Sequence, residues 1–137
     1  MTVEGEVVGS IGPGLCVLVG VTHTDDAATA DRLATKVWNL RCFDDDDGAM
    51  NRSVAEVGGS VLVVSQFTLY ADTRKGRRPS FLDAAPPSLG NERYEGYCAA
   101  LAARGVTVAQ GIFGAEMAVE LLNDGPFTIW LDSAATA

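Results

Sequence analysis

Two short apolar runs constrain the fold of this 137-residue chain more than any other feature. They extend from Leu15 to Val21 and from Val61 to Gln66, and both are rich in Val and Leu. Their length and their β-branched residues are typical of strands, and neither run approaches the length of a membrane span. We therefore expect both segments to be buried strands.

Two other segments carry apolar residues at helical spacing. The first helix is expected to begin at Asp25-Asp26, with Thr24 as its cap, and to run to about Leu40, because acidic residues favour a helix N-terminus. The second is expected to follow Pro86-Pro87-Ser88 and to end at Gly105. Their apolar faces consist of Ala30, Leu33, Ala34, Val37 and Trp38 in the first helix and of Tyr94, Tyr97, Cys98 and Leu101 in the second.

Alternating apolar and polar residues predict further strands. Thr2 to Gly9 is expected to be a short strand with a Glu-Gly turn. The other alternating positions are Val106 and Val108, then Met117, Val119 and Leu121, and, after a turn at Asp124-Gly125-Pro126, Ile129 and Leu131. We therefore predict an α/β fold: a mixed β-sheet or barrel-like domain of about six strands with two or three helices. Residues 1–137 are expected to form a single domain.

The charge of the chain limits the partners that it can bind. The formal net charge is −8, which argues against binding nucleic acid through general electrostatics. Four basic residues nevertheless cluster around Gly76. Such a patch fits a partner that is anionic at one place only, such as the end of an RNA, but it also fits a solvated loop. The cluster consists of Arg74, Lys75, Arg77 and Arg78.

Several familiar kinds of site are not indicated by the sequence. The acidic run from Asp44 to Asp47 lacks the spacing of an EF-hand loop, and the single histidine, His23, supports neither a zinc site nor a catalytic triad. No glycine-rich phosphate loop is present. We therefore expect no metal and no cofactor. Three scattered cysteines suggest reduced, mostly buried thiols, and the N-terminus does not resemble a signal peptide, so a cytoplasmic location is expected. The cysteines are Cys16, Cys42 and Cys98.

Two polar motifs stand out against this background. Ser65-Gln66-Phe67-Thr68-Leu69-Tyr70 lies at the end of the second run, immediately after its apolar residues, and polar residues at a strand end are a common place for a site. Asn123-Asp124-Gly125-Pro126-Phe127-Thr128 has the composition of a tight loop. Each also has a plain structural explanation, since a strand can simply end in polar residues and a hairpin can hold an ordinary trans proline.

Together the two motifs resemble those of the D-aminoacyl-tRNA deacylase family, which carries Ser-Gln-Phe-Thr-Leu and Asn-x-Gly-Pro-Val-Thr in the same order. This chain departs from the family at Phe127, where valine is usual, and at Ala84. Members also usually begin with a further strand that contains Gln-Arg-Val, whose arginine helps to hold the Gly-Pro motif, and this sequence starts at what would be the end of that strand. The resemblance extends to Gly12-x-Gly14-Leu15, Met50-Asn51, Gly58 to Val64, Arg78-Pro79-Ser80-Phe81, Ala85, Phe113 and Met117.

The resemblance implies a hydrolase that removes D-amino acids from the 3′-terminal adenosine of tRNA, a chiral proofreading step of translation. It implies a homodimer in which Gly125-Pro126, as a cis pair, enters the partner's pocket and holds the substrate's α-ammonium group with two carbonyl oxygens. An L side chain would then clash with the pocket wall. Glycine, including glycine mischarged on tRNA-Ala, would pass. No membrane or DNA partner is implied.

The same resemblance assigns roles to individual residues. Backbone N–H groups near Phe67 and Thr68 would stabilise the developing oxyanion, and a bound water rather than Thr68 would be the nucleophile, because no base is evident beside its hydroxyl. Phe113 and Met117 would line the pocket, although both could equally be core residues. The catalytic set is Ser65, Gln66, Phe67 and Thr68; the substrate-binding set is Gly125, Pro126, Pro79, Ser80, Phe81, Ala85, Phe113 and Met117; the tRNA-binding set is Arg74, Lys75, Arg77 and Arg78.

Two alternatives remain open from the sequence. A catalytically inactive homologue would bind tRNA or another partner without releasing an amino acid. A hydrolase of another small ester would act independently of tRNA.

Overall fold

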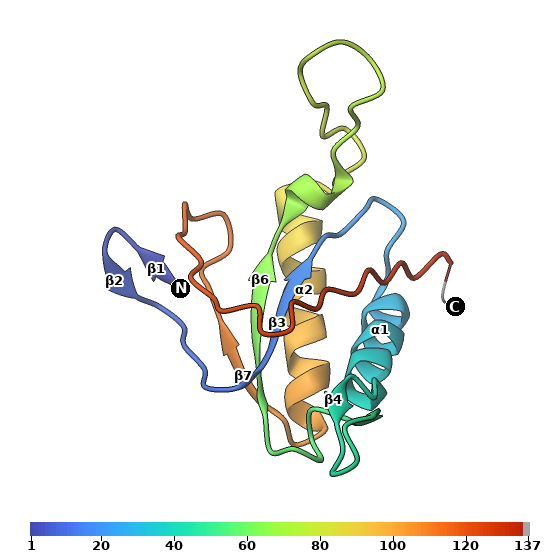
Figure 1. Cartoon of the computed structure of the whole chain (residues 1–137). Helices are drawn as coiled ribbons and strands as arrows, with labels where there is room; N and C mark the ends of the chain where they lie inside the picture. The colour runs from blue at the N-terminus through green and yellow to red at the C-terminus, as the bar shows by residue number, and fades with distance from the viewer. Residues whose placement is uncertain (136–137) are drawn as a thin grey trace.

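The computed structural model describes residues 1–135 and is built around a three-stranded parallel sheet (Figure 1). Strand β6 (Ser60–Ser65) lies in the middle, between β3 (Gly14–Val19) and β7 (Thr107–Gln110). Gly14 pairs with Ser60, and Ser60 pairs with Thr107. Parallel strands need long crossover connections, and these carry the helices.

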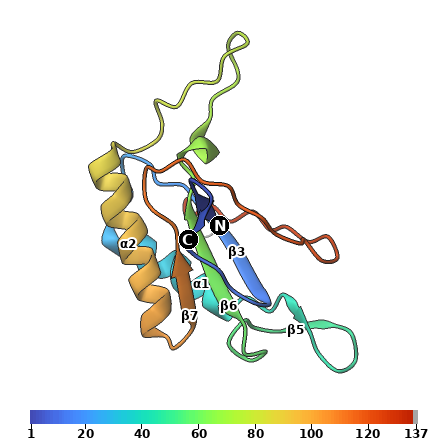
Figure 2. The ribbon, with the colours of Figure 1, turned by 90° about the vertical axis from the view of Figure 1, so that its left-hand side faces the viewer.

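Both α-helices cover the same face of this sheet (Figure 2). Helix α1 (Ala27–Asn39) follows β3, and α2 (Pro87–Ala103) precedes β7. The predicted apolar face of α2 is confirmed, since its four residues are all buried. Tyr94 is also held by its hydroxyl, which donates to the Val63 carbonyl over 2.8 Å. The helices therefore form the main core with the sheet.

Three predictions about these elements need correction. Helix α1 begins two residues later than predicted, because Asp26 is the cap and its carboxylate accepts the Thr29 N–H over 2.8 Å. Strand β3 is not buried on both faces, since Leu18 is 46% exposed. The cysteines are not mostly buried either: Cys98 is buried, Cys42 is half-buried and Cys16 is exposed on β3.

The remaining strands are short hairpins, and the sheet does not close. Strands β1 (Thr2–Val3) and β2 (Glu6–Val7) pair across the expected turn, and β4 (Phe43–Asp44) pairs with β5 (Met50–Arg52). The described residues therefore form three separate sheets of two or three strands, and the barrel-like expectation is wrong. Neither α-helix of residues 1–135 combines the length and the apolar character that crossing a membrane requires.

The strands expected near residues 117–121 and 129–131 are absent from the described part of the chain. This stretch holds only one isolated bridge, between Thr2 and Ala118. Residues 121–130 are exposed throughout and lie on the side of the sheet opposite the helices (Figure 2). Alternation alone does not make a strand, because a strand also needs a neighbouring backbone with which to form hydrogen bonds.

Candidate active site

The first motif lies at the C-terminal end of β6, as expected. Ser65 is the last residue of the strand, and Gln66 is the N-cap residue of the single helical turn η1 (Phe67–Tyr70). The Gln66 N–H donates to the Val19 carbonyl over 2.8 Å, which ties the turn to the end of β3. The motif is thus held at the edge where two parallel strands end, a common place for a site in open α/β sheets.

The hydrogen bonds of η1 leave two backbone donors outside the turn. Its own bonds begin with the Leu69 N–H, which donates to the Gln66 carbonyl over 3.2 Å. The N–H groups of Phe67 and Thr68 precede this bond, and the first N–H groups of a helical turn have no acceptor within it. Both residues are exposed. The turn can therefore offer two neighbouring donors to an anionic group, as the oxyanion prediction requires.

The Thr68 hydroxyl has no base beside it in the described structure. It accepts a hydrogen bond from the Gln66 side-chain amide, Nε2 to Oγ1, over 2.5 Å. An amide N–H can donate to the hydroxyl but cannot take its proton. The ring of His23, the single histidine, instead contacts the Leu82 carbonyl over 2.7 Å. No base in the described residues is in place to activate this hydroxyl, and the expectation that Thr68 is not the nucleophile stays a prediction.

For the deacylation of D-tyrosyl-tRNA that the resemblance implies, we expect Thr68→Val to retain a rate within about tenfold of the unmodified chain, because it removes a hydroxyl that nothing activates. The turn itself is kept, since valine preserves the shape of the side chain and the backbone N–H. Steady-state rates of amino-acid release measure the effect. A loss on the scale of a deleted nucleophile, about 10⁶-fold, would make Thr68 the attacking group.

The segment that follows the basic loop returns to the motif. The ring centroids of Phe67 and Phe81 lie 5.1 Å apart at an interplanar angle of 74°, an edge-to-face contact. Ala85 is held just past the end of β3, where its N–H donates to the Val21 carbonyl over 2.8 Å. The structure therefore brings Phe81 to the first motif and anchors Ala85 beside β3. Pro79 is exposed, and Ser80 belongs to the neck of the loop.

Phe113 and Met117 are not brought to a common wall. Phe113 packs against the main core, with its ring 6.2 Å from that of Tyr94. Met117 packs in a second cluster that covers the other face of β6 and includes Met1 and Leu62. These contacts are those of core residues, the second of the two explanations that the sequence allowed. A role in a substrate pocket stays a prediction for both.

The second motif forms an exposed turn. The Asn123 side chain holds it by accepting the Phe127 N–H over 2.9 Å and by donating to the Thr128 hydroxyl over 3.1 Å. Gly125 has φ +130°, a conformation that favours glycine. No peptide bond of residues 1–135 is cis, so the cis Gly125-Pro126 pair expected from the resemblance is not found here. A trans bond does not present two parallel carbonyl oxygens to an ammonium group.

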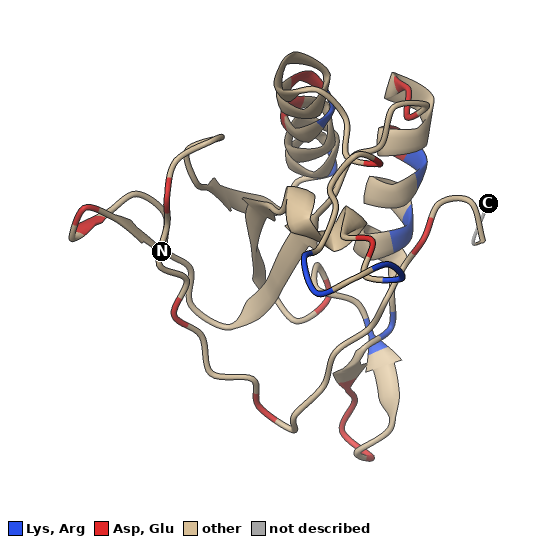
Figure 3. Cartoon of the chain, turned by 90° about the horizontal axis from the view of Figure 1, so that it is seen from above, with Lys and Arg blue, Asp and Glu red and all other residues tan. Residues whose placement is uncertain are grey.

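The four basic residues lie on one protruding loop. Residues 72–80 extend beyond the rest of the fold (Figure 1, top), and Figure 3 shows their charges at the end of the molecule that faces the viewer. All four side chains belong to exposed residues. The loop follows η1 directly and returns at Phe81. The basic cluster is therefore connected at both ends to the first motif.

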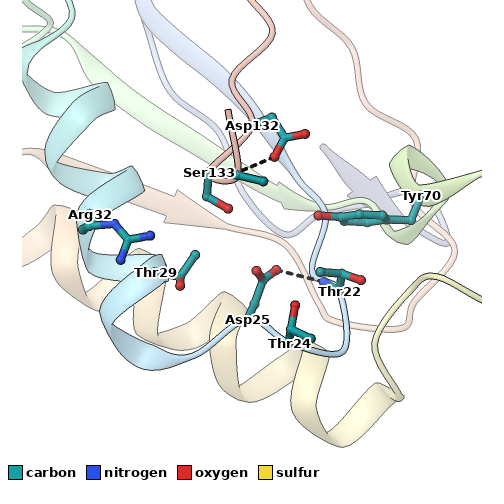
Figure 4. A pocket seen from close by; sticks show the side chains of 9 residues that line it. Thr22, Thr24, Asp25, Thr29, Arg32, Tyr70, Asp132 and Ser133 are labelled. Carbon is teal, nitrogen blue, oxygen red and sulfur yellow. Dashed lines mark hydrogen bonds between the residues drawn. The ribbon is translucent and has the colours of Figure 1, made fainter. Parts of the chain in front are cut away.

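A pocket of about 220 Å³ lies beside this site, at the start of α1 (Figure 4). None of the predicted site residues lines it, although Tyr70, the last residue of the first motif, does. Burial raises the pKa of the Tyr70 hydroxyl, and the carboxylates of Asp25 and Asp132 raise it further. The sequence offered no signal for this grouping, which depends on tertiary contacts. The lining residues are Thr22, Thr24, Asp25, Thr29, Arg32, Tyr70, Asp132, Ser133 and Ala134.

Comparison with known proteins settles the family. A family model described as D-Tyr-tRNA(Tyr) deacylase matches residues 1–132. This chain belongs to that family. It is 60% identical over 134 residues to the D-aminoacyl-tRNA deacylase of Thermomicrobium roseum, covering 98% of this chain and 87% of that one. It is 60% identical over 132 residues to the protein of the same name from Ruegeria pomeroyi, covering 96% and 91%.

Solved structures agree with this placement. A protein described as a c-Myc DNA Unwinding Element Binding Protein matches with a TM-score of 0.88 and 36% identity, over 96% of this chain and 89% of that one. A probable eukaryotic D-amino acid tRNA deacylase matches with a TM-score of 0.61 and 18% identity, over 74% and 75%, which supports the fold alone. The family predicted from two short motifs is confirmed, and with it the predicted class, a deacylase.

Proposed function

We propose that this chain hydrolyses the ester bond between a D-amino acid and the 3′-terminal adenosine of tRNA. The match of the family model over residues 1–132 carries the proposal, and the relatives named D-aminoacyl-tRNA deacylase support it. The position of the first motif at the end of β6 supports it from the structure. Because the proposed substrate serves translation, the proposed place of action is the cytoplasm.

The proposed reaction uses backbone donors and water. Water attacks the carbonyl carbon of the ester, and the negative charge that develops on the carbonyl oxygen is stabilised by the N–H groups of Phe67 and Thr68. The bond from that carbon to the ribose oxygen then breaks, and the ribose oxygen takes the proton that the attacking water loses, so the products are the free amino acid and tRNA. The water is positioned by backbone groups and by the ribose 2′-hydroxyl. Ser65 and Gln66 shape the site below these donors.

The edge-to-face pair of Phe67 and Phe81 is the proposed contact for the terminal adenosine. Phe67 is 57% exposed although it is aromatic, and exposed aromatic rings are the usual stacking partners of unpaired bases. The ring of Phe81 holds that of Phe67 from the side and leaves it accessible. Ser80 and Pro79, which come just before Phe81, would line the way from the basic loop to the adenosine.

We further propose that the active form is a homodimer. The segment 121–130 exposes large apolar side chains, among them Leu122 at 90% and Trp130 at 68%. Leu18 of β3 is exposed as well. Apolar surface of this kind is a cost to an isolated chain and is typical of an interface. A second copy would cover this apolar surface, and the exposed turn at Gly125-Pro126 would then lie against the partner chain.

The proposal is tested by deacylation of D-tyrosyl-tRNA and L-tyrosyl-tRNA in parallel. We expect amino-acid release from the D form and at least about tenfold slower release from the L form. A steric clash with the L side chain is sufficient for a difference of this size. Glycyl-tRNA, whose amino acid has no side chain, is expected to be cleaved as well. Equal release from the D and L forms would contradict chiral selection.

One observation favours a second candidate function. The trans Gly125-Pro126 bond lacks the arrangement on which ammonium capture was expected to rest. A homologue that binds tRNA without cleaving it would tolerate this geometry. Binding of D-tyrosyl-tRNA with no release of D-tyrosine at saturating protein would favour that candidate over the deacylase.

A further inference from the structure

The basic loop is anchored only at its neck. The Asp72 N–H donates to the Ser80 carbonyl over 2.7 Å, and the Ser80 N–H donates back over 2.8 Å. Every residue between Thr73 and Pro79 is exposed. Gly76 at φ +68° allows the chain to turn at the tip. The charged side chains of the loop therefore meet solvent, and any order among them has to come from contacts within the loop.

One of the four basic side chains has such a contact. The Arg74 guanidinium donates to both carboxylate oxygens of Asp72, Nε to Oδ1 over 2.9 Å and Nη2 to Oδ2 over 2.7 Å. The Arg74 N–H donates to Oδ1 as well, over 3.0 Å. These bonds lower the pKa of Asp72 to about 2, so the carboxylate is charged at neutral pH. The charges of Arg74 and Asp72 therefore cancel at the neck.

The other three basic side chains differ from Arg74. Within residues 1–135, Lys75, Arg77 and Arg78 form no ion pair and no side-chain hydrogen bond. Their charge is therefore available to an anion. On a chain with a net charge of −8, they form a local positive site rather than part of a positive surface.

We propose that Asp72 is a positioning residue that withdraws Arg74 from RNA binding and leaves Lys75, Arg77 and Arg78 as the phosphate-binding set. This rests on the proposed function, which makes the end of a tRNA the partner. A phosphate that approached Arg74 would meet the Asp72 carboxylate beside it. The Nε–Nη2 edge, which Arg74 could otherwise offer to a phosphate as a pair of donors, is already occupied by Asp72. The clamp also orders the neck before binding, so less conformational entropy is lost when RNA arrives.

The logarithm of the association constant for tRNA falls linearly with the logarithm of the salt concentration. The magnitude of this slope increases by about 0.7 to 0.9 for each phosphate contact. The probe is tRNA that carries no amino acid. The variants are Arg77→Gln, its matched control Arg74→Gln, and Asp72→Asn. We expect Arg77→Gln to remove one phosphate contact and so to reduce the magnitude of the slope by the value for one contact. The loss of affinity between about 50 and about 200 mM salt then becomes about threefold smaller. Arg74→Gln is expected to leave the slope unchanged. Asp72→Asn frees Arg74 and is expected to steepen it.

The outcomes separate this inference from the proposed function. Equal flattening by Arg74→Gln and Arg77→Gln would overturn the inference, because Arg74 would then contact phosphate. A slope near zero for the unmodified chain would overturn it too. Thermal unfolding of each variant checks that the fold is kept, and all the substituted basic side chains are exposed. Release of D-tyrosine from D-tyrosyl-tRNA is measured separately, so that a chain with the expected slopes and no release contradicts only the proposed function.

Discussion

Phe67→Pro is expected to reduce kcat for D-tyrosyl-tRNA by about 10²–10³ relative to Phe67→Ala, the cost of losing one oxyanion donor. Both variants lack the aromatic ring, so the comparison cancels its contribution to binding the adenosine. Only the proline variant lacks the backbone N–H at this position. The difference between the two rates therefore isolates a main-chain donor, which side-chain substitution ordinarily cannot reach.

The position tolerates proline on structural grounds. Phe67 is the first residue of η1, where proline is favoured because its missing N–H has no partner within the turn. The preceding Gln66 has φ −137° and ψ 80°, outside the helical region that a following proline disfavours. Matching circular dichroism spectra and melting temperatures for the two variants are the control. Equal kcat values in folded variants would contradict the assignment of the Phe67 N–H to the oxyanion.

Gly14→Ala is expected to destabilise the fold by about 3 kcal/mol, the upper end of the usual range for overpacking, or more. Gly14 is the first residue of β3 and pairs with Ser60. A Cβ there would lie 1.8 Å from the Ser60 carbonyl oxygen and 2.7 Å from the Ser60 nitrogen. Both atoms belong to the backbone of the central strand, so neither can rotate away. The pairing of β3 with β6 would have to open at this end.

Gly96→Ala is the matched control for the same addition of one methyl group. Gly96 lies in α2, is exposed, and has nothing within 4 Å of the added Cβ. Alanine is favoured over glycine inside a helix, so this variant is expected to gain about 0.5–1 kcal/mol. Denaturant unfolding of the two variants measures the opposite signs. A Gly14→Ala variant as stable as the unmodified chain would show that the two strands do not approach as described.

The sequence predicted best those features that depend on local pattern. The buried face of α2 follows from apolar residues at helical spacing, and β6 is buried on both faces as its continuous apolar run indicates. The run of β3 has the same character, yet Leu18 is exposed, because burial depends on what packs against a strand. Asp26 caps α1 instead of Thr24, because threonine and aspartate are both favoured at a helix N-cap and the two residues lie close together in the sequence.

In the site, too, features that depend on local sequence were predictable and features that depend on tertiary contacts were not. The place of the first motif, directly after a buried strand, was evident from the order of residues. The contact between Phe67 and Phe81 was not, because it depends on the path of the loop between them. The contact between Arg74 and Asp72 could not be predicted, because nothing in the sequence distinguishes Arg74 from the other three basic residues of the loop. The isomer of Gly125-Pro126 could not be deduced either, because the two forms differ little in energy for any peptide bond before proline.

The order of strands in the sheet has a consequence for how the protein is made. Gly14 at the start of β3 pairs with Ser60, and Ser60 pairs with Thr107, so both pairings close long stretches of chain. Such closures are slow, since their entropy is lost before any contact repays it. While the ribosome is still synthesising α2, β6 has only one of its neighbours and its second edge is open. Exposed strand edges invite pairing with other chains. The second edge of β6 therefore stays open until residues 107–110 are available to pair with it.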